Sequence, residues 1–193
     1  MAFRPNLERK EEKERVRAAL LRAALHLGAS HGFSSVGLRE VAREAGIAPT
    51  SFYRHFADME ELGMALVREL VGHSLRGVGE LARVAERGAL VTTLVDAMLK
   101  AAQRDSELLR FVASERVGSF GGLRTLLRGE LSTLAELVQR AGGEHVPLMA
   151  AEAIVTLLVD GAIRALDAGA SATEAVRDGL SWTITRLLEV PHE

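Results

Sequence analysis

The segment LREVAREAGIAPTSFYRHF, residues 38–56, constrains the fold most, because it has the pattern of two short helices joined by a tight turn. Apolar residues recur on one face of the first helix, and they are Leu38, Val41, Ala42 and Ala45. Gly46 follows where a helix end favours a residue that tolerates a positive φ. Pro49 suits the first position of the next helix, where a backbone N–H is not needed. The segment therefore predicts a helix-turn-helix.

The second helix of this pair is predicted to read DNA, because its outward face consists of hydrogen-bonding groups. Phe52 and Phe56 are four residues apart and are expected to point inward together. The outward set comprises Thr50, Ser51, Tyr53, Arg54 and His55. Such a helix suits the major groove, where base edges present donors and acceptors. The alternative is a helical interaction protein with a plain turn, for which this polar face would be incidental.

The composition is that of a globular protein, with 48% hydrophobic and 26% charged residues in a chain of 193. The N-terminal residues are highly charged, no apolar run has the length of a membrane span, and cysteine is absent. We therefore expect a cytoplasmic protein without disulfides. Residues 1–56 hold ten Lys and Arg against six Glu, a formal charge of +4, and the remainder holds fourteen against twenty, or −6. This division is expected of a nucleic-acid-binding module joined to a regulatory one.

Helical spacing continues along most of the chain, so the predicted fold is all-α. We expect an N-terminal three-helix helix-turn-helix domain over residues 1–57 and a helical ligand-binding and dimerisation domain over residues 58–193. The predicted helices outside residues 38–56 span 9–30, 58–86, 90–103, 106–115, 120–140, 146–168 and 173–190. Asp58 and Glu61 have capping-box spacing at the start of the long helix. Gly72, Gly77 and Gly79 interrupt that helix, so either its far half bends or other helices pack closely against it.

The last two predicted helices carry broad apolar faces that suit a two-fold interface. Small residues within these faces allow close approach of a neighbouring helix. The residues predicted to contact a partner subunit are Ile154, Leu158, Gly161, Leu180, Ile184 and Leu187. Packing within one chain is the alternative. We favour a homodimer because a helix-turn-helix generally needs a partner to bind enough DNA.

Residues 10–70, with REVAREAGIAPTSFYRHF at their centre, resemble the tetracycline-repressor (TetR) family of transcription regulators. Within that family the chain is similar to the fatty-acid biosynthesis repressors FabR and DesT, and the segment LLRFVASERVGSFGGLRTLLRGELSTLAELV resembles them more loosely. The resemblance implies a homodimeric repressor that binds a palindromic operator and controls unsaturated-fatty-acid synthesis or desaturation. It also implies a long-chain acyl thioester, of coenzyme A or acyl carrier protein, as the effector ligand. We expect no cofactor.

Two positions depart from the pattern of many family members. Gly37 stands where a Ser or Thr often caps the first helix of the pair, and the acidic run Asp58–Glu61 stands in place of a Lys. Neither position offers a hydroxyl or a cation to a phosphate. We therefore predict that Arg39 and Arg43, which share a helix face, anchor phosphates together with Tyr53. The alternative is a solvated face on which these arginines pair with neighbouring glutamates.

An acyl chain requires a long apolar cavity with a polar mouth. The predicted wall residues lie on the central helices and are Leu94, Met98, Leu108, Phe111, Val112, Leu131, Leu134 and Leu158. Arginines suited to an anionic head group are Arg110, Arg116, Arg124 and Arg128. Core packing and a solvated helix face are the respective alternatives.

Repression of drug-response or aromatic-compound-response genes is the closest alternative function. The aromatic content of 4% favours an aliphatic ligand over a flat aromatic one. Enzyme functions find little support, because the six histidines have no HxxxH or HExxH spacing and no GxGxxG or phosphate-loop motif is present. We therefore predict no catalytic residue and no metal site.

Overall fold

The computed structural model describes residues 5–143 and 145–189, and these residues form helices and turns with no strand among them. The predicted all-α fold is confirmed. The elements are α1 (Pro5–His31), η1 (Phe33–Ser35), α2 (Leu38–Glu44), α3 (Pro49–Phe52), α4 (Met59–Leu66), η2 (Val67–Val71), α5 (Gly72–Val84), η3 (Arg87–Ala89), α6 (Leu90–Arg104), α7 (Ser106–Glu115), α8 (Gly121–Gly142), α9 (Leu148–Ala168) and α10 (Ala170–Glu189). Outside the helix-turn-helix, the predicted helices are present with ends shifted by a few residues. Val190, the predicted end of the last helix, lies outside the described residues.

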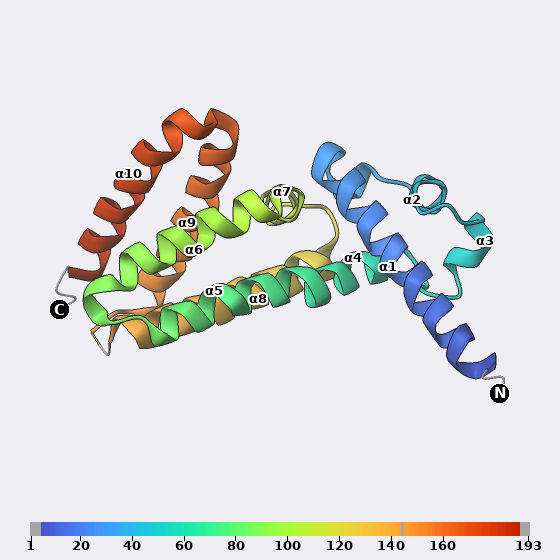
Figure 1. Cartoon of the computed structure of the whole chain (residues 1–193), viewed down its shortest axis with the longest axis horizontal. Helices are drawn as coiled ribbons and strands as arrows, with labels where there is room; N and C mark the ends of the chain where they lie inside the picture. Colours follow the sequence, from blue (N-terminus) through green and yellow to red (C-terminus); the bar gives the residue numbers. More distant parts are fainter. Residues whose placement is uncertain (1–4, 144, 190–193) are drawn as a thin grey trace.

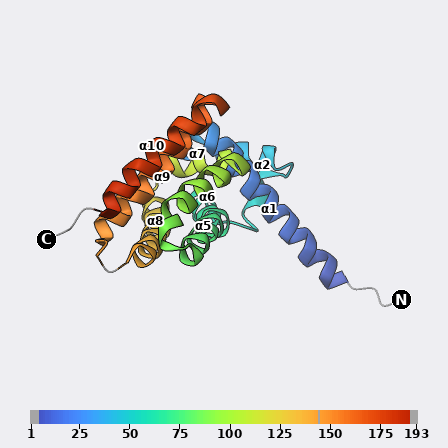
Figure 2. The ribbon, with the colours of Figure 1, turned by 60° about the vertical axis from the view of Figure 1, so that its left-hand side comes forward.

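The molecule is elongated, with the helix-turn-helix at one end and α9 and α10 toward the other (Figure 1). α1 packs against α2 and α4, and its N-terminal half extends past the rest of the molecule as an arm (Figure 2). α5 to α10 form the larger part, the C-terminal bundle, in which α5 lies along α8 and α10 lies along α9. None of the described helices is long and apolar enough to cross a membrane.

One continuous helical path connects the two parts of the molecule. α4 leads into η2, a short π-helical stretch, and η2 leads into α5. π-helical turns are rare and are frequently found at functional positions. α4 packs against both α1 and α8, so it belongs to the packing of both parts. The domain boundary after residue 57 stays a prediction.

Close packing accounts for two of the three glycines of this path that were noted in the sequence. At Gly79 an added Cβ would collide with the side chain of Leu137 on α8, and at Gly72 it would lie 2.9 Å from a carboxylate oxygen of Glu130. Gly77 faces open space. Of the two explanations offered by the sequence, close approach of a neighbouring helix therefore applies at Gly72 and Gly79.

A shared core at Phe33 joins the helix-turn-helix to α7. The Phe33 ring is fully buried and packs edge-on against Phe111, with ring centroids 5.7 Å apart. The backbone N–H of Phe33 donates to Oε1 of the buried Glu115, 3.1 Å away. At the surface of the same junction, Nδ1 of His26 on α1 lies 2.7 Å from Oε1 of Glu107 on α7, and this hydrogen bond raises the pKa of His26. The helix-turn-helix is thus attached to the bundle at α7 as well as through α4.

Most of the predicted dimer residues lie inside one chain, which corrects the assignment of those residues to an interface. Five of the six are buried within the protomer, namely Ile154, Leu158, Gly161, Leu180 and Ile184. An added Cβ at Gly161 would lie 2.6 Å from Leu180 Cδ1, so the small residue brings α9 and α10 together. Leu187 is half-buried. Because a residue without exposed surface cannot contact a partner, any interface on these helices must use outward residues such as Trp182, which is 66% exposed.

Candidate nucleic-acid interface

The turn between α2 and α3 has the predicted geometry. Gly46 has a φ of 70°, the conformation for which glycine is favoured. The N–H of Ile47 donates to the carbonyl of Ala42 at 2.9 Å and closes the turn. Ala48 is extended at the N-cap of α3, and Pro49 takes the first helical position. The helix-turn-helix is therefore present.

α3 is shorter than the predicted reading helix. Regular helix ends at Phe52, and Tyr53 to His55 form turns. The N–H of His55 donates to the carbonyl of Phe52 at 2.9 Å, three residues back, so the chain tightens as it leaves α3. Phe52 and Phe56 are both buried, with ring centroids 5.9 Å apart. These two rings hold the recognition segment, residues 49–56, although only one turn of it is α-helical.

The predicted base-reading residues all belong to this segment. Thr50, Tyr53 and Arg54 are exposed, and Tyr53 has 64% of its surface accessible. Ser51 and His55 are half-buried. The segment thus presents hydroxyl, phenol and guanidinium groups to solvent, and their contact with base edges stays a prediction.

Arg39 and Arg43 are exposed on α2. Within residues 5–143 and 145–189, no carboxylate lies at ion-pair distance from either guanidinium. The alternative in which they pair with neighbouring glutamates is therefore not what this structure shows. Both guanidinium groups are available for phosphate contacts, which stay a prediction.

The acidic run that follows the recognition segment serves as a helix cap. Oδ1 of Asp58 accepts from the N–H of Glu61 at 2.8 Å, and Oε2 of Glu61 accepts from the N–H of Ala57 at 2.5 Å. Asp58 thus caps α4 as predicted, and Glu61 reaches back to the N–H of Ala57, one residue before the N-cap position that a standard capping box uses. Gly37, at the N-cap of α2, makes no side-chain cap, in agreement with the sequence.

A cleft of about 460 Å³ between α1 and α3 brings further cations to the recognition segment. Arg9 and Lys13 of α1 line it together with Ser51, Arg54 and His55. Neither Arg9 nor Lys13 was among the residues predicted from the sequence to contact DNA. The available signal was their spacing of four residues, which places them on one helix face.

His55 is held neutral in this setting. Burial is the largest cause that lowers its pKa, and the charges of Lys13, Arg17 and Arg54 act in the same direction. Its Nδ1 atom is buried and has no hydrogen-bond partner among the described residues. His55 therefore has an unused hydrogen-bonding position beside the cleft.

Arg17 fixes α1 over the helix-turn-helix. Its guanidinium lies 4.9 Å from the centroid of the Phe56 ring and pairs with Glu69 of η2 at 2.6 Å. These contacts set the position of α1 relative to both the recognition segment and the long helical path. Arg9 and Lys13 are consequently held beside α3.

The N-terminal part of the chain matches a known family. Residues 20–66 match the model for bacterial regulatory proteins of the tetR family. This part of the chain is a TetR-family DNA-binding domain. The match covers α2, the turn, the recognition segment and α4, and it leaves out Arg9, Lys13 and Arg17 of α1.

The whole chain also has the fold of solved TetR-type regulators. A transcriptional regulator from Rhodococcus sp. Rha1 is 22% identical, with a TM-score of 0.72 over 92% of this chain and 96% of that one. FadR, a fatty acid degradation regulator from Bacillus halodurans, is 19% identical, with a TM-score of 0.69 over 91% and 99%. A Clostridium perfringens protein described as a fatty acid metabolism regulator is 17% identical, with a TM-score of 0.70 over 89% and 99%. Identities this low establish the fold alone, and the particular similarity to FabR and DesT stays a prediction.

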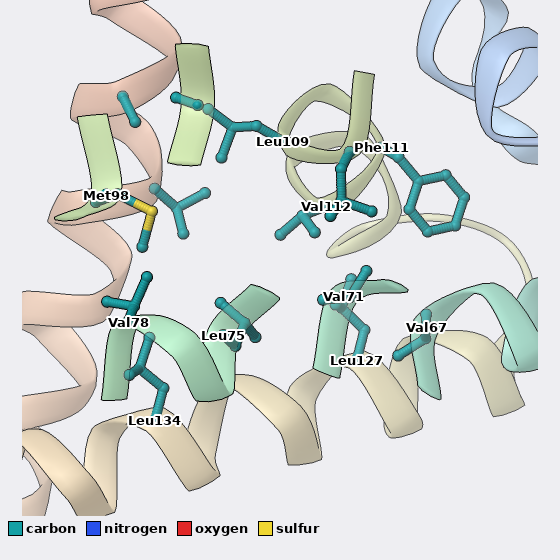
Figure 3. Packing of buried hydrophobic residues seen from close by; sticks show 14 of the residues in the cluster. Val67, Val71, Leu75, Val78, Met98, Leu109, Phe111, Val112, Leu127 and Leu134 are labelled. Atoms are coloured by element: carbon teal, nitrogen blue, oxygen red, sulfur yellow. The ribbon is translucent and has the colours of Figure 1, made fainter. Parts of the chain in front are cut away.

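An apolar cavity lies between the long helical path of this TetR-type fold and α6 and α7. Its volume is about 30 Å³, and the predicted residues Met98, Leu108 and Val112 line it. Val71 and Leu75 line it from η2 and α5, and Figure 3 shows them facing Val112 across the core. The other predicted wall residues divide into Leu131, which lines a second cavity, and Leu94, Phe111, Leu134 and Leu158, which are buried and line neither.

The second cavity, of about 200 Å³, lies among the end of α7, α8 and α9 and contains two of the predicted arginines, Arg116 and Arg128. Arg116 also pairs with Asp160, whereas Arg128 has no ion-pair partner in the part of the chain that the structure describes. Arg110 and Arg124 are engaged elsewhere, with an aspartate and a backbone carbonyl respectively, each at 2.7 Å.

Proposed function

We propose that this protein is a homodimeric TetR-type repressor whose affinity for a palindromic operator is set by a long-chain acyl thioester. The observation that carries the proposal is the helix-turn-helix, whose exposed Arg39, Arg43 and Arg54 lack carboxylate partners within the described residues. α4 leads from this domain without a break into the helical path that lines the apolar cavity. A DNA-binding surface and a ligand site on one continuous element can be coupled.

Dimerisation is supported by the outward face of α10. Trp182 is 66% exposed, and the guanidinium of Arg186 lies 5.9 Å from its ring centroid. Tryptophan and arginine are enriched at the energetic centres of protein interfaces. Two-fold packing about this face pairs two recognition segments on one operator, as dimeric helix-turn-helix proteins require.

Substitution of Trp182 tests the dimer. We expect Trp182→Arg to sediment as a monomer at micromolar concentration, because a buried guanidinium would replace an apolar anchor. The matched control is Val84→Arg on α5, since Val84 is also 66% exposed. A Trp182→Arg protein that remains dimeric, or a monomeric wild type that binds the operator fully, contradicts this part of the proposal.

An amphiphilic ligand is favoured because the two cavities meet at one residue. Val159 of α9 lines both the apolar cavity and the arginine-lined cavity. An acyl thioester of coenzyme A has an aliphatic tail for the first environment and an anionic head for Arg128 in the second. Two of the similar structures are also described as regulators of fatty-acid metabolism. This combination fits an acyl thioester better than a flat aromatic drug.

Ligand entry has to move the long helical path. The two cavities measure about 30 and 200 Å³, below the roughly 300 Å³ at which ligand pockets usually begin. An acyl tail therefore displaces the lining side chains, among them the deformable Met98 and, on the path itself, Val71 and Leu75. A ligand that binds the displaced arrangement better shifts the population toward it and thereby changes the orientation of α4.

Operator titration tests the ligand. The probe is a duplex selected by the full-length protein from a random pool, and its affinity is measured by fluorescence anisotropy with oleoyl-coenzyme A, palmitoyl-coenzyme A or a planar aromatic drug. We expect one or both thioesters to change affinity about 5- to 150-fold. Val159→Phe should abolish this response and retain DNA binding, whereas Val117→Phe, at a position 85% exposed, should retain both. A tenfold effect of the drug with no effect of either thioester would instead favour a drug-response repressor.

A further inference from the structure

α1 carries a line of cations that continues beyond its buried part. Arg9, Lys13 and Arg17 follow one another at intervals of four residues, so they share one helix face. Val16 is half-buried and Leu20 is fully buried on the portion that packs in the core. α1 is therefore anchored by apolar packing at one end, and its cationic end lies beside the recognition segment (Figure 1).

The cleft between α1 and α3 has an excess of positive charge. Arg9, Lys13 and Arg54 line it, and none of them has a carboxylate at ion-pair distance within the described ranges. The carboxylate of Glu12 also lines the cleft, but it pairs with Arg15. Such a concentration of cations with few counter-charges attracts anions.

Hydrogen-bonding groups accompany these charges. The half-buried Ser51 and His55 line the same cleft. Nδ1 of His55 is buried without a partner in the described chain, and an unpaired buried polar atom is costly. A ligand with acceptor oxygens could accept hydrogen bonds from the cationic side chains and from the Ser51 hydroxyl.

We infer that this cleft seats a backbone phosphate of the operator, so that α1 and α3 hold one DNA strand between them. The inference rests on the proposed DNA-binding function and extends the DNA contacts beyond the helix-turn-helix. Phosphodiester oxygens accept hydrogen bonds from guanidinium, ammonium and hydroxyl groups, which Arg9, Lys13 and Ser51 supply. Because a phosphate carries no sequence information, these contacts raise affinity for all sequences and fix the position of α3 in the groove.

A phosphate in the cleft also changes the protonation of His55. In the free protein burial, together with the charges of Lys13, Arg17 and Arg54, lowers the pKa of His55; Arg9 lines the same cleft, and Glu12 and Glu69 are each paired with an arginine. The negative charge of a phosphate favours the imidazolium. Operator binding then takes up a proton, and operator affinity rises as the pH falls from about 8 to about 6 more steeply than for His55→Gln.

The salt dependence of operator affinity tests the inference. The full-length protein and the duplex that it selects from a random pool are used, and affinity is measured over a range of KCl concentrations. Loss of one phosphate contact in Lys13→Gln should reduce the slope of log affinity against log salt by about 0.9 per half-site, equivalent to about fivefold weaker binding near 0.15 M salt. Lys10→Gln is the matched control, because Lys10 is exposed on α1 and does not line the cleft. We expect the control to keep the wild-type slope.

Neutral phosphate analogues locate the contact. Each operator phosphate is replaced in turn by methylphosphonate, and we expect one position per half-site to weaken binding of the wild type and of Lys10→Gln more than binding of Lys13→Gln. The inference is overturned if Lys13→Gln and Arg9→Gln both keep the wild-type slope and sensitivity at every phosphate. Failure of the wild type to select any duplex is a different result, because it overturns the proposed DNA-binding function itself.

Discussion

Replacement of Phe33 by alanine measures how firmly the TetR-type domain is attached to the C-terminal bundle. The ring is fully buried and contacts Phe111 and Phe120, each with a centroid distance of 5.7 Å. Truncation of a buried phenylalanine to alanine lowers the free energy of unfolding by about 3–5 kcal/mol. The loss at Phe33 should lie toward the upper end of this range, because its two aromatic pairs are lost as well. We expect the free energy of unfolding to fall by about 4 kcal/mol. The variant should remain folded, because domains have about 5–15 kcal/mol of stability.

Urea denaturation followed by circular dichroism gives this free energy. Phe56→Ala is the matched control, since Phe56 is also buried but packs under the recognition segment. Both variants should lose similar stability. Phe33→Ala should retain operator binding and lose much of the thioester response, whereas Phe56→Ala should lose operator affinity. A stability loss below about 1 kcal/mol for Phe33→Ala, or an undiminished thioester response, would refute the assigned role of this junction.

Three further predictions concern individual positions. Gly77→Ala should stabilise the protein by about 0.5–1 kcal/mol, because alanine has the higher helix propensity and its Cβ would face open space. Gly79→Ala should destabilise it by about 1–3 kcal/mol, because the added Cβ would collide with Leu137. Thermal unfolding of the two variants tests both expectations. Since the pKa of His55 is lowered in the folded state, its contribution to stability is present above about pH 6.5, the unfolded value, and is lost as the pH falls below it through the lower folded-state pKa; the free energy of unfolding of His55→Gln should depend less on pH between 7 and 5, and an unchanged pH dependence would oppose this. Arg54→Ala should change which duplexes are selected, because loss of a base contact costs about 1–3 kcal/mol of binding free energy. Arg39→Ala should weaken binding to all duplexes alike, because it removes a phosphate contact. The reverse pattern would interchange the roles of the two arginines.

Local sequence was sufficient for the helix-turn-helix. Gly46 and Pro49 set the turn through their own backbone preferences, and the capping pair Asp58 and Glu61 needs only its spacing. The helical spacing of apolar residues likewise predicted the all-α fold and placed the helix ends to within a few residues. The recognition helix was predicted to be too long. The chain leaves α3 after Phe52 in a tightened turn that buries Phe56, and the burial of this ring depends on tertiary packing that the local sequence does not specify.

Tertiary structure decided what lies against each helix face. Leu94 and Met98 are one turn apart on α6, yet only Met98 lines the apolar cavity. The apolar stripes of α9 and α10 predicted a partner subunit, but Gly161 and Leu180 close on each other within the chain. The cleft that joins α1 to the recognition segment involves residues far apart in sequence, so no local pattern contains it. Sequence by itself determined which residues share a face, because that follows from the helix period; the neighbour of that face follows from how the helices pack together.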